Sequence, residues 1–333
     1  MNKRIFKVAV VGCGTISPNH LSSIAALDNV KVVALCDTKP EKAEDKKIEF
    51  GLDAKIYTDY YEMLETEELD AVHIATPHYL HAPMTIAAFK KDIDVFLEKP
   101  MCINIEQIKE MLEAEKNSKA RACVCFQNRF NPSTLTAKSI VEEDGGALSA
   151  YGTVIWQRTA PYYTESGWRG TYATEGGGVM INQAIHTLDL LCQFMGKPEK
   201  LWATKSNHHL KDVIEVEDSC EGMVEFEGGK FGNFYATTAF HFANSTVVFI
   251  KTKNHRLEIR DNRLYVDYKL VEEATTENFM VKAEYGNGHL YLIKEFYKAI
   301  ENGTPMPITL ESAQYAVRLL LAAYRSNDEE TII

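Results

Sequence analysis

A glycine-rich stretch near the N-terminus has the residue types and spacing of a phosphate-binding turn. An apolar run leads into Gly12-Cys13-Gly14-Thr15-Ile16-Ser17, and a helical pattern follows. In a G-x-G-x-x-G pattern the first glycine permits a tight turn and the second lets a pyrophosphate approach the backbone. The third position needs a small residue, here Ser17. The helix N-terminus would favour the phosphates, so we expect a dinucleotide to contact Gly12, Gly14, Thr15, Ile16 and Ser17.

A carboxylate about 20 residues further on bears on the choice of dinucleotide. Asp37 follows the apolar run Val30–Cys36, and Thr38, Lys39 and Pro40 come next without an arginine. Such a carboxylate can accept hydrogen bonds from the adenosine ribose diol and would repel a 2′-phosphate. A helix-capping role is the alternative for Asp37. We therefore expect NAD in preference to NADP.

The first third of the chain alternates apolar runs with helical patterns, as βαβ units require. The apolar runs are Ile5–Val11, Val30–Cys36, Ala71–Ala75, Ile93–Leu97 and Arg121–Phe126, and the helical patterns are Leu21–Leu27, Pro40–Phe50, Tyr79–Lys90 and Ile105–Lys116. Strands separated by helices of this length predict a parallel sheet. We therefore expect an α/β Rossmann domain over residues 1–122.

In the rest of the chain, turns rather than helices connect the predicted strands. The strand patterns are Ala150–Gln157, Ser219–Phe226, Phe231–Thr238, Thr246–Thr252, Arg256–Arg260 and Arg263–Tyr268, and the helical patterns are Val179–Phe194, His289–Glu301 and Leu310–Arg325. Gly228–Gly229 and Asp261–Asn262 are typical of hairpin turns. Residues 123–333 should therefore form an α+β domain around a mostly antiparallel sheet, and the C-terminal helices could pack back on the first domain.

Charge and composition exclude several classes of partner. The 333 residues carry a formal net charge of −11, so we expect neither a nucleic-acid partner nor docking on an anionic membrane. No apolar run approaches the ~20 residues of a membrane span. The seven cysteines lack disulfide-like or zinc-like spacing, and the N-terminal apolar run is too short for a signal peptide. We expect reduced, mostly buried thiols in a cytoplasmic protein.

Four ordered motifs give the chain a resemblance to the glucose–fructose oxidoreductase, inositol dehydrogenase and rhizopine-catabolism (Gfo/Idh/MocA) family. They are Val10-Val11-Gly12-Cys13-Gly14, Ala75-Thr76-Pro77 with His81, Glu98-Lys99-Pro100, and Gly176-Gly177-Gly178 followed by His186 and Asp189-Leu190. The resemblance implies a Rossmann domain and a second domain with a large open antiparallel sheet. It also implies that Glu98 and catalytic Lys99 lie at the nicotinamide end. Homodimers or homotetramers would form through the open sheet face.

Three residues are the candidates for catalysis at a substrate hydroxyl, and two of them, Lys99 and His186, could handle its proton. A partly desolvated Lys99 would have a lowered pKa and could stabilise an oxyanion or accept a proton. His186 is a natural acid–base group, although a buried core histidine is the alternative. Asn182 lies on the same predicted helix face, where many family members carry Asp, and an amide cannot hold that proton. Asp189 could orient His186 or pair elsewhere.

The remaining candidates surround these three. We expect Thr76, Pro77, His78, His81, Glu98 and Asn128, with Lys99, to bind cofactor. We expect Arg129, Tyr162, Trp168, Arg169 and Gln183, with Asn182 and His186, to bind substrate. His78 and His81 resemble a metal pair, but no nearby carboxylate or cysteine completes a site, so we expect no metal.

The sequence therefore predicts an NAD-dependent oxidoreductase acting on a secondary alcohol or ketone carbon of a sugar, nucleotide-sugar or cyclic polyol. Asn182-Gln183-x-x-His186 resembles the form found in relatives that use nucleotide-linked or decorated sugars. An inositol or dihydrodiol dehydrogenase is the alternative within the enzyme class. A non-catalytic dinucleotide-binding regulator is the alternative outside it, although such a protein would be expected to lose Lys99 or His186.

Overall fold

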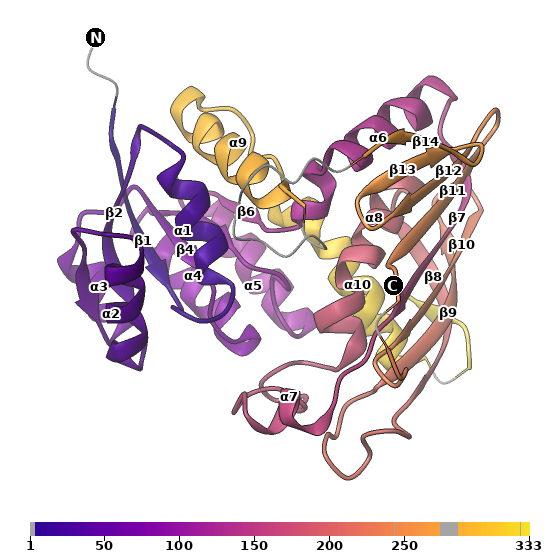
Figure 1. Cartoon of the computed structure of the whole chain (residues 1–333), viewed down its shortest axis with the longest axis horizontal. Coiled ribbons are helices and arrows are strands. Elements are labelled where there is room, and N and C mark those ends of the chain that lie inside the picture. Colours follow the sequence, from indigo (N-terminus) through magenta and orange to yellow (C-terminus); the bar gives the residue numbers. More distant parts are fainter. Residues whose placement is uncertain (1–3, 243, 274–285, 327) are drawn as a thin grey trace.

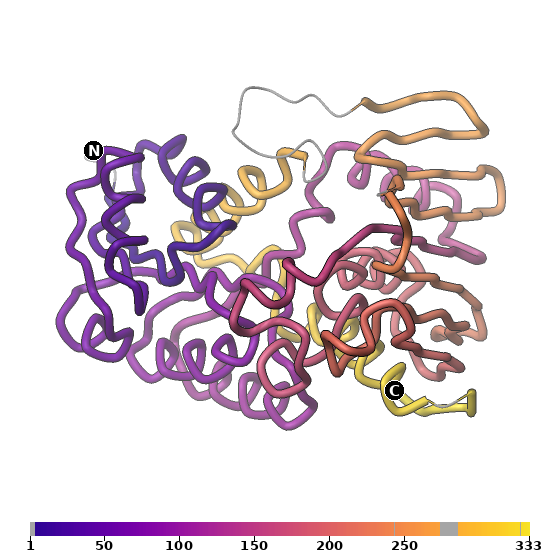
Figure 2. Tube along the Cα trace, turned by 60° about the horizontal axis from the view of Figure 1, so that its bottom comes forward, coloured from indigo at the N-terminus to yellow at the C-terminus, as the bar shows by residue number. Residues whose placement is uncertain are grey.

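Two β-sheets, one from each half of the chain, organise the molecule (Figure 1). The structure is a computed structural model that describes residues 4–242, 244–273, 286–326 and 328–333. Helices lie on the first sheet and between the two sheets (Figure 1), and the C-terminus lies in the half of the molecule that holds the second sheet (Figure 2). Within the described residues, no helix is long and apolar enough to cross a membrane.

The first sheet is parallel and has the strand order β3-β2-β1-β4-β5-β6. Its strands are β1 (Phe6–Val11), β2 (Val30–Cys36), β3 (Lys55–Tyr57), β4 (Ala71–Ile74), β5 (Asp94–Leu97) and β6 (Ala122–Val124). The connecting helices are α1 (Ser17–Ala25), α2 (Pro40–Glu49), α3 (Tyr60–Thr66), α4 (His81–Phe89) after the short η1 (His78–Leu80), and α5 (Ile105–Lys116). This doubly wound order reverses between β1 and β4, and ligands of such sheets bind at the carboxyl ends of the strands there.

The second sheet has nine strands in the order β14-β13-β12-β11-β7-β10-β9-β8-β15, and only the β7–β10 pair is parallel. The strands are β7 (Ala147–Ile155), β8 (Pro198–Ser206), β9 (Ser219–Phe226), β10 (Lys230–Thr237), β11 (Val247–Thr252), β12 (Arg256–Arg260), β13 (Arg263–Val266), β14 (Lys269–Glu272) and β15 (Thr331–Ile332). One face is covered by α6 (Pro132–Glu143) and α8 (Ile185–Met195) (Figure 1). The short helices η2 (Gln127–Phe130), α7 (Ala160–Thr164) and η3 (Met180–Ala184) lie in the connections.

The last two long helices join the halves. The helix α9 (Gly288–Asn302) packs on α1 and η2, while α10 (Leu310–Arg325) contacts α5, α8 and β8 (Figure 1). Both helices are amphipathic, and leucine, isoleucine, phenylalanine and alanine side chains on their inner faces are fully buried. The C-terminal segment therefore stabilises the arrangement of the two sheets.

The predicted architecture is confirmed, and several predicted elements have the bounds that the structure shows. Val30–Cys36, Ser219–Phe226 and Ile105–Lys116 match their elements residue for residue. Gly228–Gly229 and Asp261–Asn262 all have positive φ, as the predicted hairpin turns require. The single helix predicted over Val179–Phe194 is wrong in one respect, because Met180–Ala184 is a π-helix that precedes α8.

The prediction missed several elements with weak hydrophobic patterns. These are β3, β8, β14, β15, α3, α6 and α7. Tertiary contacts stabilise them: α6, for example, buries only Ser133, Thr134, Ala137 and Val141 and packs on β12–β14. A segment with so few buried apolar residues has no strong periodicity of its own.

A buried hydrogen-bond chain connects the first sheet to the helices beside it. The Tyr297 hydroxyl lies 2.7 Å from His73 Nε2, His73 Nδ1 lies 3.0 Å from His20 Nδ1, and His20 Nε2 lies 3.0 Å from Glu98 Oε1. If Glu98 is ionised and both histidines are neutral, each contact has one donor and one acceptor. Burial, followed by the neighbouring His20, lowers the pKa of His73 well below its usual value, which supports the neutral form.

We predict that the protein loses stability as the pH falls from about 6.5 to about 5. Because the folded-state pKa of His73 is depressed, the unfolded chain binds more protons in this window, and the free energy of unfolding falls by up to about 1.4 kcal/mol per pH unit for each such histidine. Urea unfolding at several pH values measures the slope. His73→Gln should reduce it, whereas His209→Gln, on an exposed residue, should not. A flat profile in the unsubstituted protein would contradict the expectation.

Candidate active site

The glycine-rich turn after β1 packs against the loop after β4. Gly12 has φ +89°, and a Cβ atom there would lie 2.4 Å from the carbonyl oxygen of Ala75, so only glycine fits. A Cβ on Gly14 would meet nothing within 4 Å, which leaves space beside the backbone. The Ser17 hydroxyl donates to the Gly14 carbonyl at 2.8 Å and tightens the turn. Thr15 is exposed at the tip, and Ile16 precedes α1.

Asp37 contacts the same turn from the end of β2. Its Oδ2 accepts a hydrogen bond from the Cys13 N–H at 2.9 Å, and its Oδ1 accepts from the Lys39 N–H at 2.9 Å. The carboxylate is half-buried. The open space at Gly14 and the adjoining carboxylate together fit an adenine dinucleotide, with its pyrophosphate at the turn and its ribose at Asp37.

The loop after β4 connects the two halves. His81 lies between two carbonyl groups, with Nδ1 2.6 Å from Pro100 O and Nε2 2.8 Å from Thr76 O. His78 Nδ1 lies 2.8 Å from the carbonyl oxygen of Glu175. Both imidazoles are buried, and burial lowers the pKa of each. These histidines thus fix the loop that carries Thr76 and Pro77.

Lys99 follows β5 and points toward the second domain. Its Nζ donates to the backbone carbonyl of Asn182 at 2.8 Å. Burial lowers the pKa of the ammonium group, while the charge of Glu98 opposes that shift. The contact places the expected catalytic lysine beside the expected substrate residues.

His186, at the start of α8, lies close to Lys99. Burial, followed by the charge of Lys99, lowers the pKa of His186 well below its usual value. Its Nδ1 atom is buried and has no hydrogen-bond partner among the described residues, and its ring lies edge-on to Phe126. An unsatisfied buried nitrogen is costly, so this atom is available for a ligand.

The π-helix presents two amides toward one tyrosine. Asn182 Nδ2 lies 3.2 Å and Gln183 Nε2 lies 3.1 Å from the Tyr162 hydroxyl, which accepts from both. π-Helical turns occur frequently at functional sites. The sequence pattern could not reveal this turn, because its residues also fit an ordinary apolar helix.

Sequence reasoning missed Glu175 and Arg158. Glu175 is fully buried and hydrogen-bonds to the side chain of Asn182. The Arg158 guanidinium stacks over Trp156 and Tyr162, with its Cζ 4.9 and 4.8 Å from the ring centroids. Neither belongs to a motif, although Glu175 directly precedes the glycine run and an acidic residue there could have been noted.

Arg169 and Trp168 lie in the same aromatic group. Arg169 Cζ is 4.2 Å from the Tyr162 ring centroid and 4.9 Å from that of Trp168. The Trp168 ring is 4.7 Å from the His78 ring. The Nε atoms of Arg158 and Arg169 are buried without hydrogen-bond partners in the described part of the chain. The loop thus brings two guanidinium groups to Tyr162.

Arg129 forms an ion pair with a carboxylate of α8. Its Nε and Nη2 donate to both carboxylate oxygens of Asp189, with the Nε–Oδ2 distance 2.7 Å. This two-bond pair uses two of the five guanidinium N–H groups, and the expected substrate-binding role of Arg129 stays a prediction. Asp189 consequently pairs with Arg129 instead of orienting His186. Asn128 Oδ1 is buried and unsatisfied among the described residues, as a cofactor-binding amide could be.

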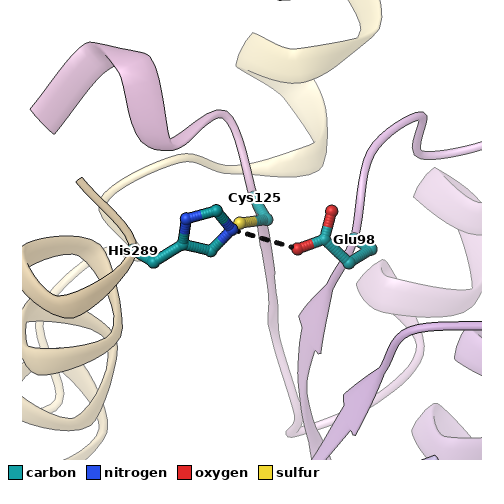
Figure 3. Close-up of side chains that lie close together, drawn as sticks. All are labelled: Glu98, Cys125 and His289. Atoms are coloured by element: carbon teal, nitrogen blue, oxygen red, sulfur yellow. Dashed lines mark ion pairs between the residues drawn. The ribbon is translucent and has the colours of Figure 1, made fainter. Parts of the chain in front are cut away.

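Glu98 lies close to Cys125 and His289, and the His289 ring faces its carboxylate (Figure 3). Ligand atoms of Glu98, Cys125 and His289 all lie within 4.8 Å of one another, close enough to hold a metal ion. However, Glu98 Oε1 lies 3.0 Å from His20 Nε2 and 3.5 Å from His289 Nε2. Burial alone would raise the pKa of Glu98, but these histidines lower it well below its usual value.

Burial also raises the pKa of the Cys125 thiol well above its usual value, and the nearby Glu98 adds to that shift. Glu98, His20 and His289 thus form a cluster of buried polar contacts directly before Lys99.

A Rossmann sheet with a glycine turn after β1 and an Asp at the end of β2, facing a half-buried lysine and histidine, is typical of a nucleotide-dependent oxidoreductase. Comparison with known proteins agrees. Residues 6–126 match the model of the oxidoreductase family with an NAD-binding Rossmann fold, and residues 134–260 match the GFO/IDH/MocA C-terminal domain. The chain belongs to this family, and it is an NAD-dependent oxidoreductase that acts on CH–OH groups.

Relatives of known activity cover much or all of the chain. A myo-inositol 2-dehydrogenase of Thermotoga maritima is 23% identical, with 97% of each chain covered. A levoglucosan dehydrogenase of Pseudarthrobacter phenanthrenivorans is 26% identical over 73% of this chain and 70% of its own length. The WlbA dehydrogenase of Bordetella pertussis, solved with NADH and UDP-GlcNAcA, has a TM-score of 0.89 and is 26% identical, with 100% of this chain and 99% of that chain covered. These relatives are sugar and polyol dehydrogenases.

We predict that Asp37→Ala relaxes the preference for NAD over NADP. The variant removes the carboxylate that would repel a 2′-phosphate, so the ratio of the NADPH and NADH dissociation constants should fall by roughly tenfold or more, corresponding to about 1.4 kcal/mol. Calorimetric titration measures both constants. Asp53→Ala, on an exposed loop residue, is the control. An unchanged ratio would show that the ribose is recognised elsewhere.

Proposed function

We propose that the protein oxidises or reduces one secondary alcohol carbon of an anionic sugar, of the nucleotide-linked or uronic type, with Lys99 and His186 handling the proton. The observation that carries the proposal is the Lys99 Nζ contact with Asn182 O, because it brings the lysine of one domain to the amides and aromatic rings of the other. Bound NAD would supply the hydride acceptor.

The depressed pKa of Lys99 suits it to the proton step. As an ammonium it stabilises the developing oxyanion, and as a neutral amine it accepts the hydroxyl proton. The lowered pKa of His186 favours its neutral form. Its Nδ1 atom has no partner among the described residues and could accept or donate a hydrogen bond near Lys99. Neither role depends on Asn182 taking a proton, which an amide cannot do.

The two stacked arginines favour a negatively charged substrate. None of the ion pairs between described residues includes Arg158 or Arg169. A substrate carboxylate or phosphate would therefore balance the positive charge of these two guanidinium groups. Arg158 Nη1 donates to the Gln157 carbonyl oxygen at 2.8 Å and Arg169 Nη1 to the Tyr162 carbonyl oxygen at 3.5 Å. Aromatic stacking holds each guanidinium in place, and its other N–H groups remain to donate to a substrate. The similarity to a dehydrogenase solved with UDP-GlcNAcA supports the same substrate class.

An inositol dehydrogenase is the second candidate. The T. maritima relative, a myo-inositol 2-dehydrogenase, matches over nearly the whole chain. A neutral cyclic polyol would leave both guanidinium groups without an anionic partner. Turnover of inositols, uronic acids and nucleotide-sugars, followed at the nicotinamide absorbance, separates the two candidates.

We predict that Lys99→Ala lowers kcat by about 10²–10⁴-fold, the range for a lost acid–base group. Because Lys99 contacts the second domain rather than the glycine turn, the NADH dissociation constant should stay within about threefold. Lys119→Ala, on an exposed residue, is the matched control. A fully active Lys99→Ala protein would remove the lysine from the mechanism.

We predict that Arg169→Ala raises KM for an anionic sugar by roughly tenfold or more and changes kcat little, because the guanidinium binds ground state and transition state alike. KM for a neutral polyol should hardly change. Arg260→Ala is the control, because Arg260 lies on β12 and pairs with Glu258. Equal KM changes for both substrates would argue against an anion contact.

We also propose that copies of the chain associate through the uncovered face of the second sheet. Tyr151, Met223, Phe231 and Tyr235 are exposed there, on three adjacent strands. Light scattering tests this: a monomer at micromolar concentration would refute it.

A reducing, cytoplasmic compartment fits the seven cysteines, which are all free and buried.

A further inference from the structure

Glu175 is a buried carboxyl group to which the proposed reaction assigns no role. It has 0% exposed surface and lies directly before the Gly176–Gly178 run. Its Oε2 accepts a hydrogen bond from the Gly170 N–H at 2.6 Å, and its Oε1 accepts one from Asn182 Nδ2. No ion pair between described residues includes it. A buried carboxylate that makes no direct ion pair is costly, so it invites a functional explanation.

Asn182 is held at both ends. Its backbone carbonyl accepts from Lys99 Nζ, and its side-chain NH₂ group donates to Glu175 and to the Tyr162 hydroxyl. The side chain is half-buried, and its Oδ1 atom makes no hydrogen bond to a described residue. This oxygen is therefore left for solvent or substrate.

Hydrogen-bond polarity explains the arrangement. A carboxylate can only accept hydrogen bonds, and the Gly170 backbone N–H can only donate and cannot turn. Ionised Glu175 therefore requires the NH₂ group of Asn182 on its own side, which directs the amide oxygen the other way. Without that requirement the amide could turn by 180° at little cost, because its two ends have nearly the same shape.

We propose that Glu175 is a positioning residue whose carboxylate fixes the Asn182 amide so that Oδ1 accepts a hydrogen bond from the reacting hydroxyl of the substrate. The inference rests on the proposed function for its substrate. At position 182 the chain has an amide, and the carboxylate of Glu175 lies one hydrogen bond behind it. The site thereby keeps an acceptor beside Lys99 without a second charge next to the ammonium.

The charge state of Glu175 should control this orientation. Burial raises the pKa of Glu175 to about 7, against the hydrogen bonds from Gly170 and Asn182 and the charge of Arg169. The titratable and charged groups that face it are Lys99, His78, Arg169, Glu217, Tyr162 and Tyr163. Protonated Glu175 could donate to the amide oxygen and let the amide turn. The productive orientation is thus expected above about pH 7 and is lost below it.

Glu175→Gln tests the polarity directly. The Gln oxygen must accept from the fixed Gly170 N–H, so its NH₂ group faces Asn182 and forces that amide to turn. We expect kcat to fall by about 10- to 100-fold, the order found for one lost active-site hydrogen bond. The acid limb near pH 7 in the kcat profile should disappear, and the NADH dissociation constant should stay within about threefold. Glu165→Gln, an exposed residue of the same segment, is the control.

The double variant Glu175→Gln/Asn182→Asp should recover most of the lost kcat. A carboxylate at position 182 accepts from the Gln NH₂ group on one side and from the substrate hydroxyl on the other. Asn182→Asp alone should instead put two carboxyl groups in contact, so one pKa rises strongly and the kcat profile shifts to higher pH. This single variant keeps the test valid if Glu175→Gln does not fold.

Nuclear magnetic resonance of the Asn182 side-chain amide provides a measurement without substrate. Its ¹⁵N shift should titrate near pH 7 in the unsubstituted protein and not in Glu175→Gln. A shift that is constant from about pH 5.5 to 8.5, a Glu175→Gln kcat within twofold of the original, or a double variant no faster than the single one overturns the inference. Absence of sugar turnover with a normal amide titration would instead refute the proposed function alone.

Discussion

The ammonium group of Lys99 lies between two sheets from different halves of the chain, and its burial is the constraint on which the site depends. A buried cation needs hydrogen-bond acceptors, and Lys99 finds one in the Asn182 carbonyl of the opposite domain. At its base, Glu98 is held by His20 and His289, from helices α1 and α9. The bond from Lys99 Nζ to the Asn182 carbonyl thus joins the two domains across the site and holds the lysine beside the expected substrate residues.

The cofactor half of the site is built from local geometry on a rigid sheet. Gly12 can adopt its positive φ and approach Ala75 because it has no Cβ atom, and β2 ends where Asp37 reaches the turn. These features follow from chain order and from the direction of parallel strands. They serve any dinucleotide-dependent reaction and say little about the substrate.

The substrate half depends on irregular backbone. A π-helical turn brings Asn182 and Gln183 to Tyr162, and the loop before it supplies Glu175 and Arg169. Here each polar side chain limits the orientation of the next, from the Gly170 N–H through the carboxylate to the amide. Such a network changes with single substitutions while the sheet beneath it does not, which agrees with a family whose members share a fold and differ in substrate.

The sequence by itself determined both fold types and the glycine turn, because these depend on hydrophobic period and on local backbone needs. Its motifs also singled out Asp37, Lys99, His186 and Asn182, whose roles stay predictions. It could not determine what each side chain contacts across the chain. The pairing of Arg129 with Asp189, the cluster at Glu98 and the Glu175–Asn182 bond join residues from separate elements. Periodicity reports which face of an element is buried, whereas hydrogen-bond partners are chosen only when the elements pack.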